Sequence, residues 1–213
     1  SKQLVRLISD IIDISKIDAN IMVINKKPVH INYIMEHVFE IFRKQTENKS
    51  IDLRMELGLK SPADYIVTDE IRVRQILINL VGNAVKFTDK GYIYFGYSLS
   101  QDKKFLEFYV EDTGPGIAKN KQKIIFGRFR QADSSISKRY GGTGLGLSIS
   151  KELCRLLGGK IWLRSTPGHG STFYFKIPYE LSDAQVEDNE VSYNIKTSID
   201  KIAGKKILVI DDS

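Results

Sequence analysis

Two asparagines one helical turn apart, Asn79 and Asn83, lie in the stretch TDEIRVRQILINLVGNAVKFT (residues 68–88). Apolar residues recur in it at helical spacing, which predicts an amphipathic helix, with Thr68 as a possible cap. A solvated face usually carries charged residues, whereas asparagine is a poor helix former. The polar face is therefore either a solvated surface or a set of short neutral ligands, with Lys86 nearby, for a group that approaches closely.

A single carboxylate, Asp112, ends the strand pattern FLEFYVED on its apolar side. It needs hydrogen-bond donors, because burying an unpaired carboxylate is costly. Two interpretations stay open: Asp112 accepts backbone N–H groups of the next turn, or it accepts a hydrogen bond from the exocyclic amine of adenine. In the second, Gly114 and Gly116 would let a flat ring approach the backbone.

A glycine cluster, GGTGLGL (residues 141–147), directly precedes a predicted helix. Its glycines could expose N–H groups to a phosphate beside the helix N-terminus, or the segment could be only a hinge. It is not a dinucleotide fingerprint, because Leu147 replaces the third glycine, and it lacks the Gly-Lys-Ser/Thr of a P-loop. The preceding residues 126–140 begin with two aromatics and continue with serines and basic residues, which is typical of a mobile lid.

The elements that must position these motifs follow from the spacing of apolar residues. We expect helices over residues 2–18, 32–47, 68–88 and 145–157, and strands over residues 22–29, 51–57, 92–99, 105–111, 160–165 and 171–177. This order predicts an α+β fold, a two-layer sandwich of one mixed sheet with helices on one face, preceded by a long helix. The apolar face of the helix over residues 32–47 consists of Ile34, Met35, Val38, Ile41 and Phe42.

Length and composition bound the remaining possibilities. The 213 residues, 42% of them hydrophobic, can form one full domain with additional segments. No run is apolar enough for a membrane span and no signal peptide is present, so we expect a cytoplasmic location, with any inner-membrane anchor elsewhere in the parent protein. The single cysteine, Cys154, falls in an apolar helix pattern and is expected in the core. Dispersed lysines give a net charge of +6, which does not favour a nucleic-acid partner over a smaller anion.

Taken in order, the motifs resemble the N, G1, F, G2 and G3 boxes of the catalytic and ATP-binding domain of sensor histidine kinases, in the GHKL superfamily. They are the Asn83 helix, DTGPG, the Phe-anchored segment, GGTGLGLSIS and TPGHGSTF. The resemblance covers residues 29–178 and implies a Bergerat-type ATP-binding fold. LISDIIDISKIDA resembles the second dimerisation helix, and KKILVIDDS resembles the start of a receiver. The implied organisation of a hybrid kinase is a partial dimerisation domain (1–20), the catalytic domain (21–179), a linker (180–204) and a partial receiver (205–213).

The resemblance also implies a role for each matching residue. Asn83 would ligate Mg²⁺ through its amide oxygen, and Asp112 would read the adenine amine of ATP. Asn79, Lys86 and Arg130 are the expected catalytic residues beside the phosphates. The other expected ATP contacts are Phe87 and Thr172 near the base, with Gly114, Gly116, Ile117, Phe129, Gly142, Thr143, Gly144, Leu145, Gly146 and Leu147.

One departure from the family's pattern concerns the phosphoryl acceptor. The family's His-Glu-hydrophobic-Arg-Thr-Pro segment is absent, and His30, His37 and His169 occupy none of its positions. We therefore expect these 213 residues to bind ATP and Mg²⁺ without phosphorylating themselves. The expected partners are the dimerisation domain of a homodimer and a receiver domain.

Two alternatives to a kinase keep the same fold. One is an ATPase of the gyrase or Hsp90 type, but the gyrase type needs a glutamate where Asn79 stands, and an amide cannot act as a base. The other is a degenerate scaffold, against which the intact Asn83, Asp112 and glycine motifs argue.

Overall fold

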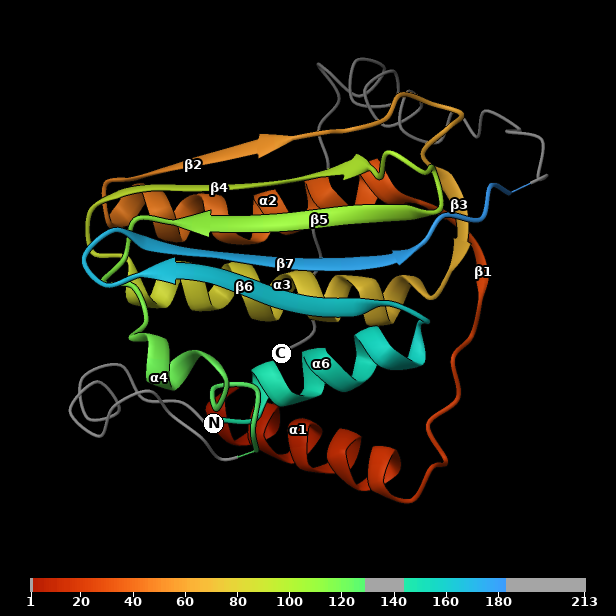
Figure 1. Ribbon diagram of the computed structural model, residues 1–213, viewed down its shortest axis with the longest axis horizontal. Coiled ribbons are helices and arrows are strands. Elements are labelled where there is room, and N and C mark those ends of the chain that lie inside the picture. The colour runs from red at the N-terminus through yellow and green to blue at the C-terminus, as the bar shows by residue number, and fades with distance from the viewer. Residues whose placement is uncertain (1, 129–143, 183–213) are drawn as a thin grey trace, which may run out of the picture. The chain divides into compact units, whose positions relative to one another are not determined.

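The computed structural model describes residues 2–128 and 144–182 (Figure 1). The helices are α1 (Lys2–Asp18), α2 (Ile31–Asn48), α3 (Glu70–Phe87), α4 (Lys119–Gln122) and α6 (Gly146–Leu156). The strands are β1 (Lys27–His30), β2 (Ile51–Glu56), β3 (Tyr65–Thr68), β4 (Gly91–Leu99), β5 (Phe105–Asp112), β6 (Lys160–Thr166) and β7 (Gly170–Pro178). None of the described helices combines the length and apolarity needed to cross a membrane.

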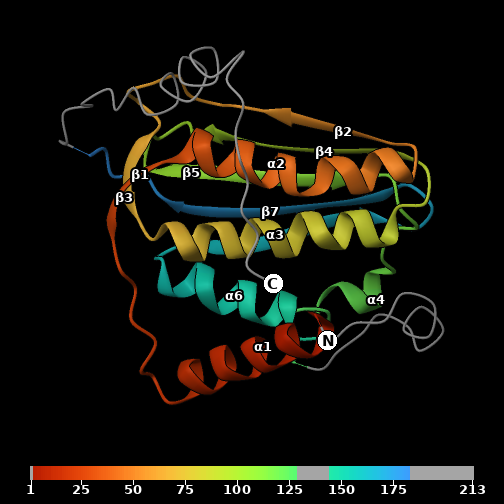
Figure 2. The same cartoon turned by 180° about the vertical axis from the view of Figure 1, so that it is seen from behind.

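A five-stranded sheet forms one layer, in the order β2-β4-β5-β7-β6. It is mixed, because β2 runs parallel to β4 whereas the other neighbours pair antiparallel. Figure 2 shows α2 and α3 lying along one face of this sheet, with α6 beside α3 and α1 packed on α6. The predicted sandwich, a mixed sheet with helices on one face, is confirmed.

The core lies between the sheet and its helices, because alternate strand residues point to that side. In β5 every second side chain is buried, from Leu106 to Asp112. Phe108 stacks on Phe175 of the neighbouring β7, with ring centroids 4.4 Å apart. Each such side chain contributes roughly 1.5–3 kcal/mol through burial. The core therefore fixes which face of β5 carries Asp112.

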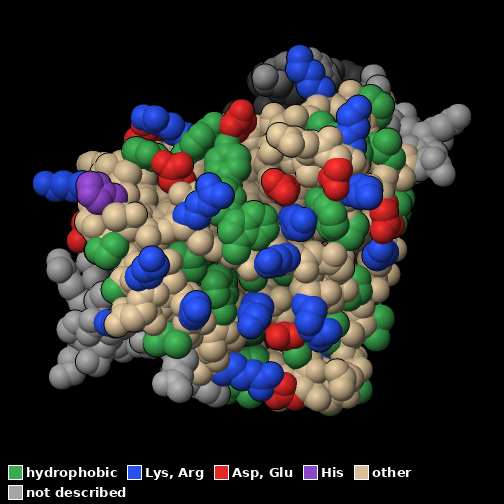
Figure 3. All heavy atoms as spheres, in the orientation of Figure 1, with side chains coloured by type: hydrophobic (Ala, Val, Ile, Leu, Met, Phe, Trp, Pro, Cys, Tyr) green, Lys and Arg blue, Asp and Glu red, His purple; other side chains and the backbone are tan. Residues whose placement is uncertain are grey.

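The opposite face of the sheet is covered by no described helix and carries hydrophobic side chains among charged ones (Figure 3). Trp162 stacks on Tyr174 with centroids 5.4 Å apart. The hydroxyls of Tyr94 and Tyr109 both donate to one carboxylate oxygen of Glu56, each at 2.5 Å. Aromatic rings and their polar partners thus form the outer surface of the sheet.

The helix α3 begins one residue later than the sequence suggested. Asp69 is its N-cap: one carboxylate oxygen accepts the N–H of Arg72 at 3.1 Å, and the other accepts the N–H of Asn25 at 2.9 Å. The expected cap, Thr68, is wrong because Thr68 is still paired in β3. The cap therefore ties the start of α3 to the segment that follows α1.

Three further expectations about the elements need correction. The strand expected over residues 22–29 is confined to β1, which pairs with the unpredicted β3. Ile41 does not face the core, because it is 40% exposed. The first residues of the expected linker are paired: the N–H of Val67 donates to the carbonyl of Glu180, and Leu181 bridges to Ile66. The compact unit accordingly extends to Ser182.

Candidate functional site

Asp112 ends β5 on the core side of the sheet, opposite Ser171 of β7. Its Oδ1 accepts the N–H of Gly114 at 2.9 Å, so the carboxylate does bind the turn that follows it. Burial raises the pKa of Asp112 to about 6, against the lowering effect of the N–H groups of Gly114 and Ser171. At neutral pH the carboxylate is therefore ionised and can accept a further hydrogen bond.

The glycines around Asp112 allow three backbone segments to pack closely. A Cβ on Gly116, whose φ is +69°, would lie 2.1 Å from the carbonyl oxygen of Thr166. A Cβ on Gly170, whose φ is +91°, would lie 1.9 Å from the carbonyl oxygen of Asp112 itself. A Cβ on Gly114 would meet the carbonyl oxygen of Phe87 at 3.0 Å. Backbone atoms thus fill the Cβ positions of Gly114 and Gly116, and this close packing joins the end of α3 to the turns after β5 and β6. The approach of a flat ring to these glycines stays a prediction.

The polar face of α3 is not simply solvated. Asn79 is 6% exposed, and its Nδ2 lies 3.4 Å from both the carbonyl of Gly146 and the hydroxyl of Ser150 on α6. Asn83 lies one turn further along the helix and is half-buried. Lys86 follows at the end of α3, with its Nζ 4.6 Å from the Phe87 ring centroid. The interpretation as a purely solvated face is wrong for the part that packs on α6.

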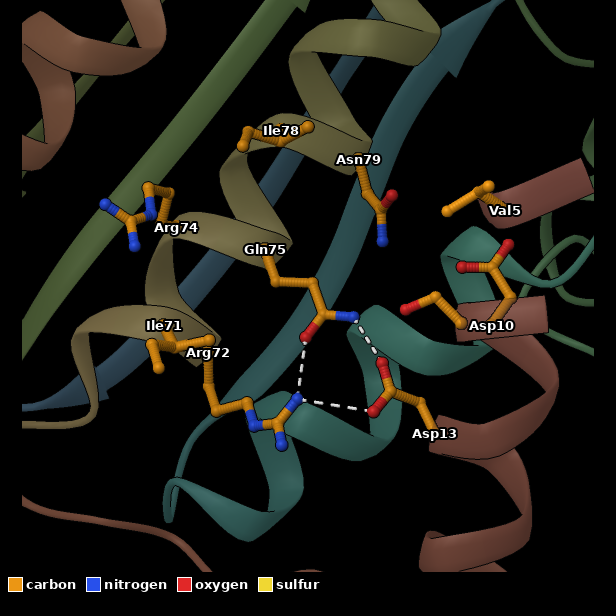
Figure 4. A pocket seen from close by; sticks show the side chains of 10 residues that line it. Val5, Asp10, Asp13, Ile71, Arg72, Arg74, Gln75, Ile78 and Asn79 are labelled. Carbon is orange, nitrogen blue, oxygen red and sulfur yellow. Dashed lines mark hydrogen bonds and ion pairs between the residues drawn. The ribbon is translucent and has the colours of Figure 1, made fainter. Parts of the chain in front are cut away.

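The first half of the polar face of α3 lies beside α1, and residues of both helices line a groove of about 520 Å³ (Figure 4). The Nε2 of Gln75 donates to one carboxylate oxygen of Asp13 at 2.8 Å. The guanidinium of Arg72 lies 3.4 Å from the other oxygen of Asp13 and donates to the Oε1 of Gln75 at 3.0 Å. One carboxylate on α1 therefore binds two side chains of α3, and in Figure 4 Asn79 points toward the same side as Gln75.

The start of α6 has the conformation that its glycines predict. Gly144 has a φ of +70°, which places it in the left-handed region. Leu145 is the N-cap residue and is buried, so its side chain packs in the core. Gly146 is the first helical residue, followed by the partly buried Leu147. Backbone N–H groups at this helix start are not used within the helix, which suits an anion.

Thr172, which was expected near the base, does not lie beside Asp112. Thr172 pairs with Glu111, so it lies on the opposite face of the sheet from Asp112. The structure therefore does not place Thr172 beside Asp112. Ser171, which is buried on the same face of the sheet as Asp112, lies there instead. The alternation of buried residues along β7 could have identified Ser171. Ser171 stands two residues before the buried Phe173, and every second residue of the strand from Ser171 onward is buried. Phe129, Arg130, Gly142 and Thr143, with most of the expected lid, lie outside the described residues.

Known proteins of one family share this arrangement. Residues 68–181 match the family model described as histidine kinase-, DNA gyrase B-, and HSP90-like ATPase. The chain is 35% identical to the signal transduction histidine-protein kinase BarA of Shigella flexneri, over 99% of the chain and 22% of BarA. It is 36% identical to the circadian input-output histidine kinase CikA of Synechococcus elongatus, over 99% of the chain and 27% of CikA. The chain thus spans about a quarter of the length of these relatives.

Solved structures give the same result. Full-length ShkA in complex with AMPPNP superposes with a TM-score of 0.75 at 33% identity, covering 85% of the chain and 37% of ShkA. The catalytic domain of histidine kinase ThkA has a TM-score of 0.62 at 28% identity, covering 73% of the chain and 99% of that domain. The chain therefore belongs to the histidine kinase-, DNA gyrase B- and HSP90-like ATPase family and has at its core the catalytic domain of a histidine kinase.

Proposed function

We propose that the chain binds ATP with Mg²⁺ and positions the γ-phosphoryl group for transfer to a histidine on a dimerisation helix. The observation that carries the proposal is that three segments come together: the turn after β5, the helix α3 and the start of α6. The turn after Asp112 meets Phe87 at the end of α3, and Asn79 of α3 meets Gly146 at the start of α6. The complex of the similar ShkA with AMPPNP supports a nucleotide as the ligand.

Each end of the nucleotide would find suitable groups. The ionised Asp112 would accept a hydrogen bond from the exocyclic amine of adenine, as charged acceptors form the stronger hydrogen bonds. Asn79, Lys86 and Arg130 would bind the phosphates, next to the backbone N–H groups at the start of α6. Phosphoryl transfer then depends on positioning and on neutralising charge, which are tasks that these groups can perform.

Asn83 is the proposed magnesium ligand. Mg²⁺ prefers oxygen ligands and usually keeps waters while binding to substrate phosphates, with few protein ligands. The half-buried carboxamide of Asn83 offers one neutral oxygen next to Asn79. Within residues 2–128 and 144–182, no group of three or more His, Cys, Asp or Glu side chains could hold a metal ion. The described residues therefore fit an ion that takes its other ligands from ATP and water, and that neutralises phosphate charge when bound.

The partners proposed for the whole protein are a dimerisation domain and a receiver domain. On α1, five apolar side chains are 47–67% exposed (Leu4, Val5, Ile8, Ile11 and Ile12), which supports α1 as one helix of a bundle. We assign residues 1–20 to the dimerisation domain, the rest of the compact unit up to Ser182 to catalysis, the following residues up to 204 to a linker and residues 205–213 to the start of a receiver. The structure of histidine kinase ThkA in complex with the response regulator protein TrrA supports a response regulator as a partner.

Calorimetric titration tests the proposed nucleotide site. The unmutated chain should bind a non-hydrolysable ATP analogue more tightly with Mg²⁺ than with EDTA. Asn83→Ala should lose this magnesium-dependent part, because the ion loses its protein ligand, while Gln101→Ala in the exposed turn between β4 and β5 should keep it. Equal affinities with and without Mg²⁺ in the unmutated chain would refute the magnesium assignment, and no binding at all would refute the nucleotide site.

A further inference from the structure

The hydroxyl of Ser165, near the end of β6, joins three backbone and side-chain groups. It accepts the N–H of Ile117 at 2.8 Å and donates to the carbonyl of Gly170 at 2.9 Å. The hydroxyl of Ser171 lies 3.0 Å away. Because a serine hydroxyl has one hydrogen and two lone pairs, Ser171 is then the donor to Ser165. A single half-buried hydroxyl thus uses its whole hydrogen-bonding capacity.

A second side chain completes this network from α4. The Nε2 of Gln122 donates to the carbonyl of Ile117 at 2.8 Å and to the carbonyl of Ser165 at 2.9 Å. Ile117 therefore has its N–H bound by Ser165 and its carbonyl bound by Gln122. Gln122 and Ser165 are separated by 43 residues, so the network links distant parts of the chain.

The network holds both sides of Asp112. On one side, Ile117 is the last residue of the glycine-containing segment that starts at Asp112 and includes Gly114, whose N–H binds the carboxylate. On the other side, Ser171 pairs with Asp112 across the sheet and is 6% exposed. Loss of the Ser165 hydroxyl would remove one hydrogen bond from the turn, at Ile117, and one from the strand, at Ser171. A carboxylate needs both neighbours in place to keep its direction, because hydrogen bonds weaken steeply away from linear geometry.

We propose that Ser165 and Gln122 are positioning residues that set base specificity, by fixing the turn and the strand that orient Asp112. This inference rests on the proposed function, since it assumes that Asp112 binds adenine. Neither side chain needs to touch the nucleotide. Their loss should weaken the discrimination between bases while leaving the phosphate contacts of α3 and α6 intact.

The discriminating probe is ITP, which carries an oxygen where ATP carries the exocyclic amine. Dissociation constants for ATP and ITP are measured with Mg²⁺ for the unmutated chain, Ser165→Ala and Gln122→Glu. The glutamate has no N–H to donate to the two carbonyls. In each variant the ratio of the ITP constant to the ATP constant should fall about three- to tenfold, the size expected for one net hydrogen bond. Ser165→Thr, which keeps the hydroxyl, should restore the ratio.

Two matched controls separate positioning from general damage. Thr166→Ala removes the neighbouring hydroxyl on β6, which is exposed, and Gln101→Glu makes the same amide-to-acid change in an exposed turn at the other end of the sheet. Both should keep the unmutated ratio. Circular dichroism checks folding, and if Ser165→Ala does not fold, Gln122→Glu alone decides the outcome.

The results separate this inference from the function on which it rests. An unchanged ratio in the folded variants overturns the inference. This includes an equal loss of ATP and ITP affinity, which is the effect of a merely structural role. Failure of the unmutated chain to bind either nucleotide refutes the proposed function instead, and the inference with it.

Discussion

Replacing Asp112 with asparagine should make the protein more stable and a weaker ATP binder at the same time. The carboxylate is 7% exposed, and burial raises its pKa from 3.8 to about 6. The folded protein therefore binds the proton more tightly than the unfolded chain does. The stability that comes from this tighter binding is fully present below pH 3.8 and is lost as the pH rises through 6.

The size of the effect follows from the two pKa values. A rise from 3.8 to about 6 corresponds to about 3 kcal/mol at neutral pH. An asparagine oxygen can still accept the N–H of Gly114, so Asp112→Asn should recover up to this amount at pH 7. For a domain of this size, the full amount should raise the unfolding midpoint by roughly 6–12 °C.

The assay is urea unfolding of both proteins at pH 4, 5, 6 and 7. The difference in unfolding free energy should be small at pH 4, about 0.5 kcal/mol, and should grow to its full size at pH 7. Affinity for ATP at pH 7 should fall about tenfold or more, because an amide N–H would face the adenine amine. If Asp112→Asn were less stable than the unmutated chain at pH 7, this would refute the conclusion that the buried charge of Asp112 costs stability. A variant that is more stable but binds ATP equally well would refute its role in binding adenine.

A pair of glycine substitutions and the reactivity of one cysteine test the packing of the domain. Gly170→Ala should lower the free energy of unfolding in urea by about 2 kcal/mol or more, because its Cβ would lie 1.9 Å from the carbonyl oxygen of Asp112. Gly168→Ala is the control: Gly168 has a φ of +81° and no atom within 4 Å of its Cβ position, so the cost should be only about 1 kcal/mol. Equal costs would mean that close packing is not the reason for Gly170. Cys154 is buried, and burial raises the pKa of its thiol to about 12. A thiol reagent at pH 8 should therefore react with Cys154 only after unfolding. Immediate reaction of the native protein would contradict the place of Cys154 in the core.

Long elements with a strong apolar period could be predicted from the sequence. The strands β5 and β7 and the helix α3 lie within a residue or two of their expected bounds. The strand β3 and the helix α4 were missed, since both are four residues long and too short to show a period. The cap of α3 was assigned one residue early because Thr68 and Asp69 can both cap a helix. Only the pairing of Thr68 in β3 decides between them.

The site divides in the same way. Asp112 and Gly144 could be found from local patterns, a carboxylate on the apolar side of a strand and a glycine before a helix. The burial of Asn79 against α6 depends on tertiary packing. Two hydrogen bonds of this network, from Ile117 to Ser165 and from Gln122 to Ser165, join residues 48 and 43 apart, and no local pattern indicates such contacts.

The end of α3, the turn after β5 and the start of α6 are proposed to bind one magnesium nucleotide. Backbone amide NMR shifts during titration with a magnesium complex of AMPPNP test this most directly. We predict saturable shifts at Asn83, Gly114 and Gly146, with none at Gln101 in the turn at the far end of the sheet. Saturable shifts confined to that far end, or no shifts at millimolar nucleotide, would contradict the account.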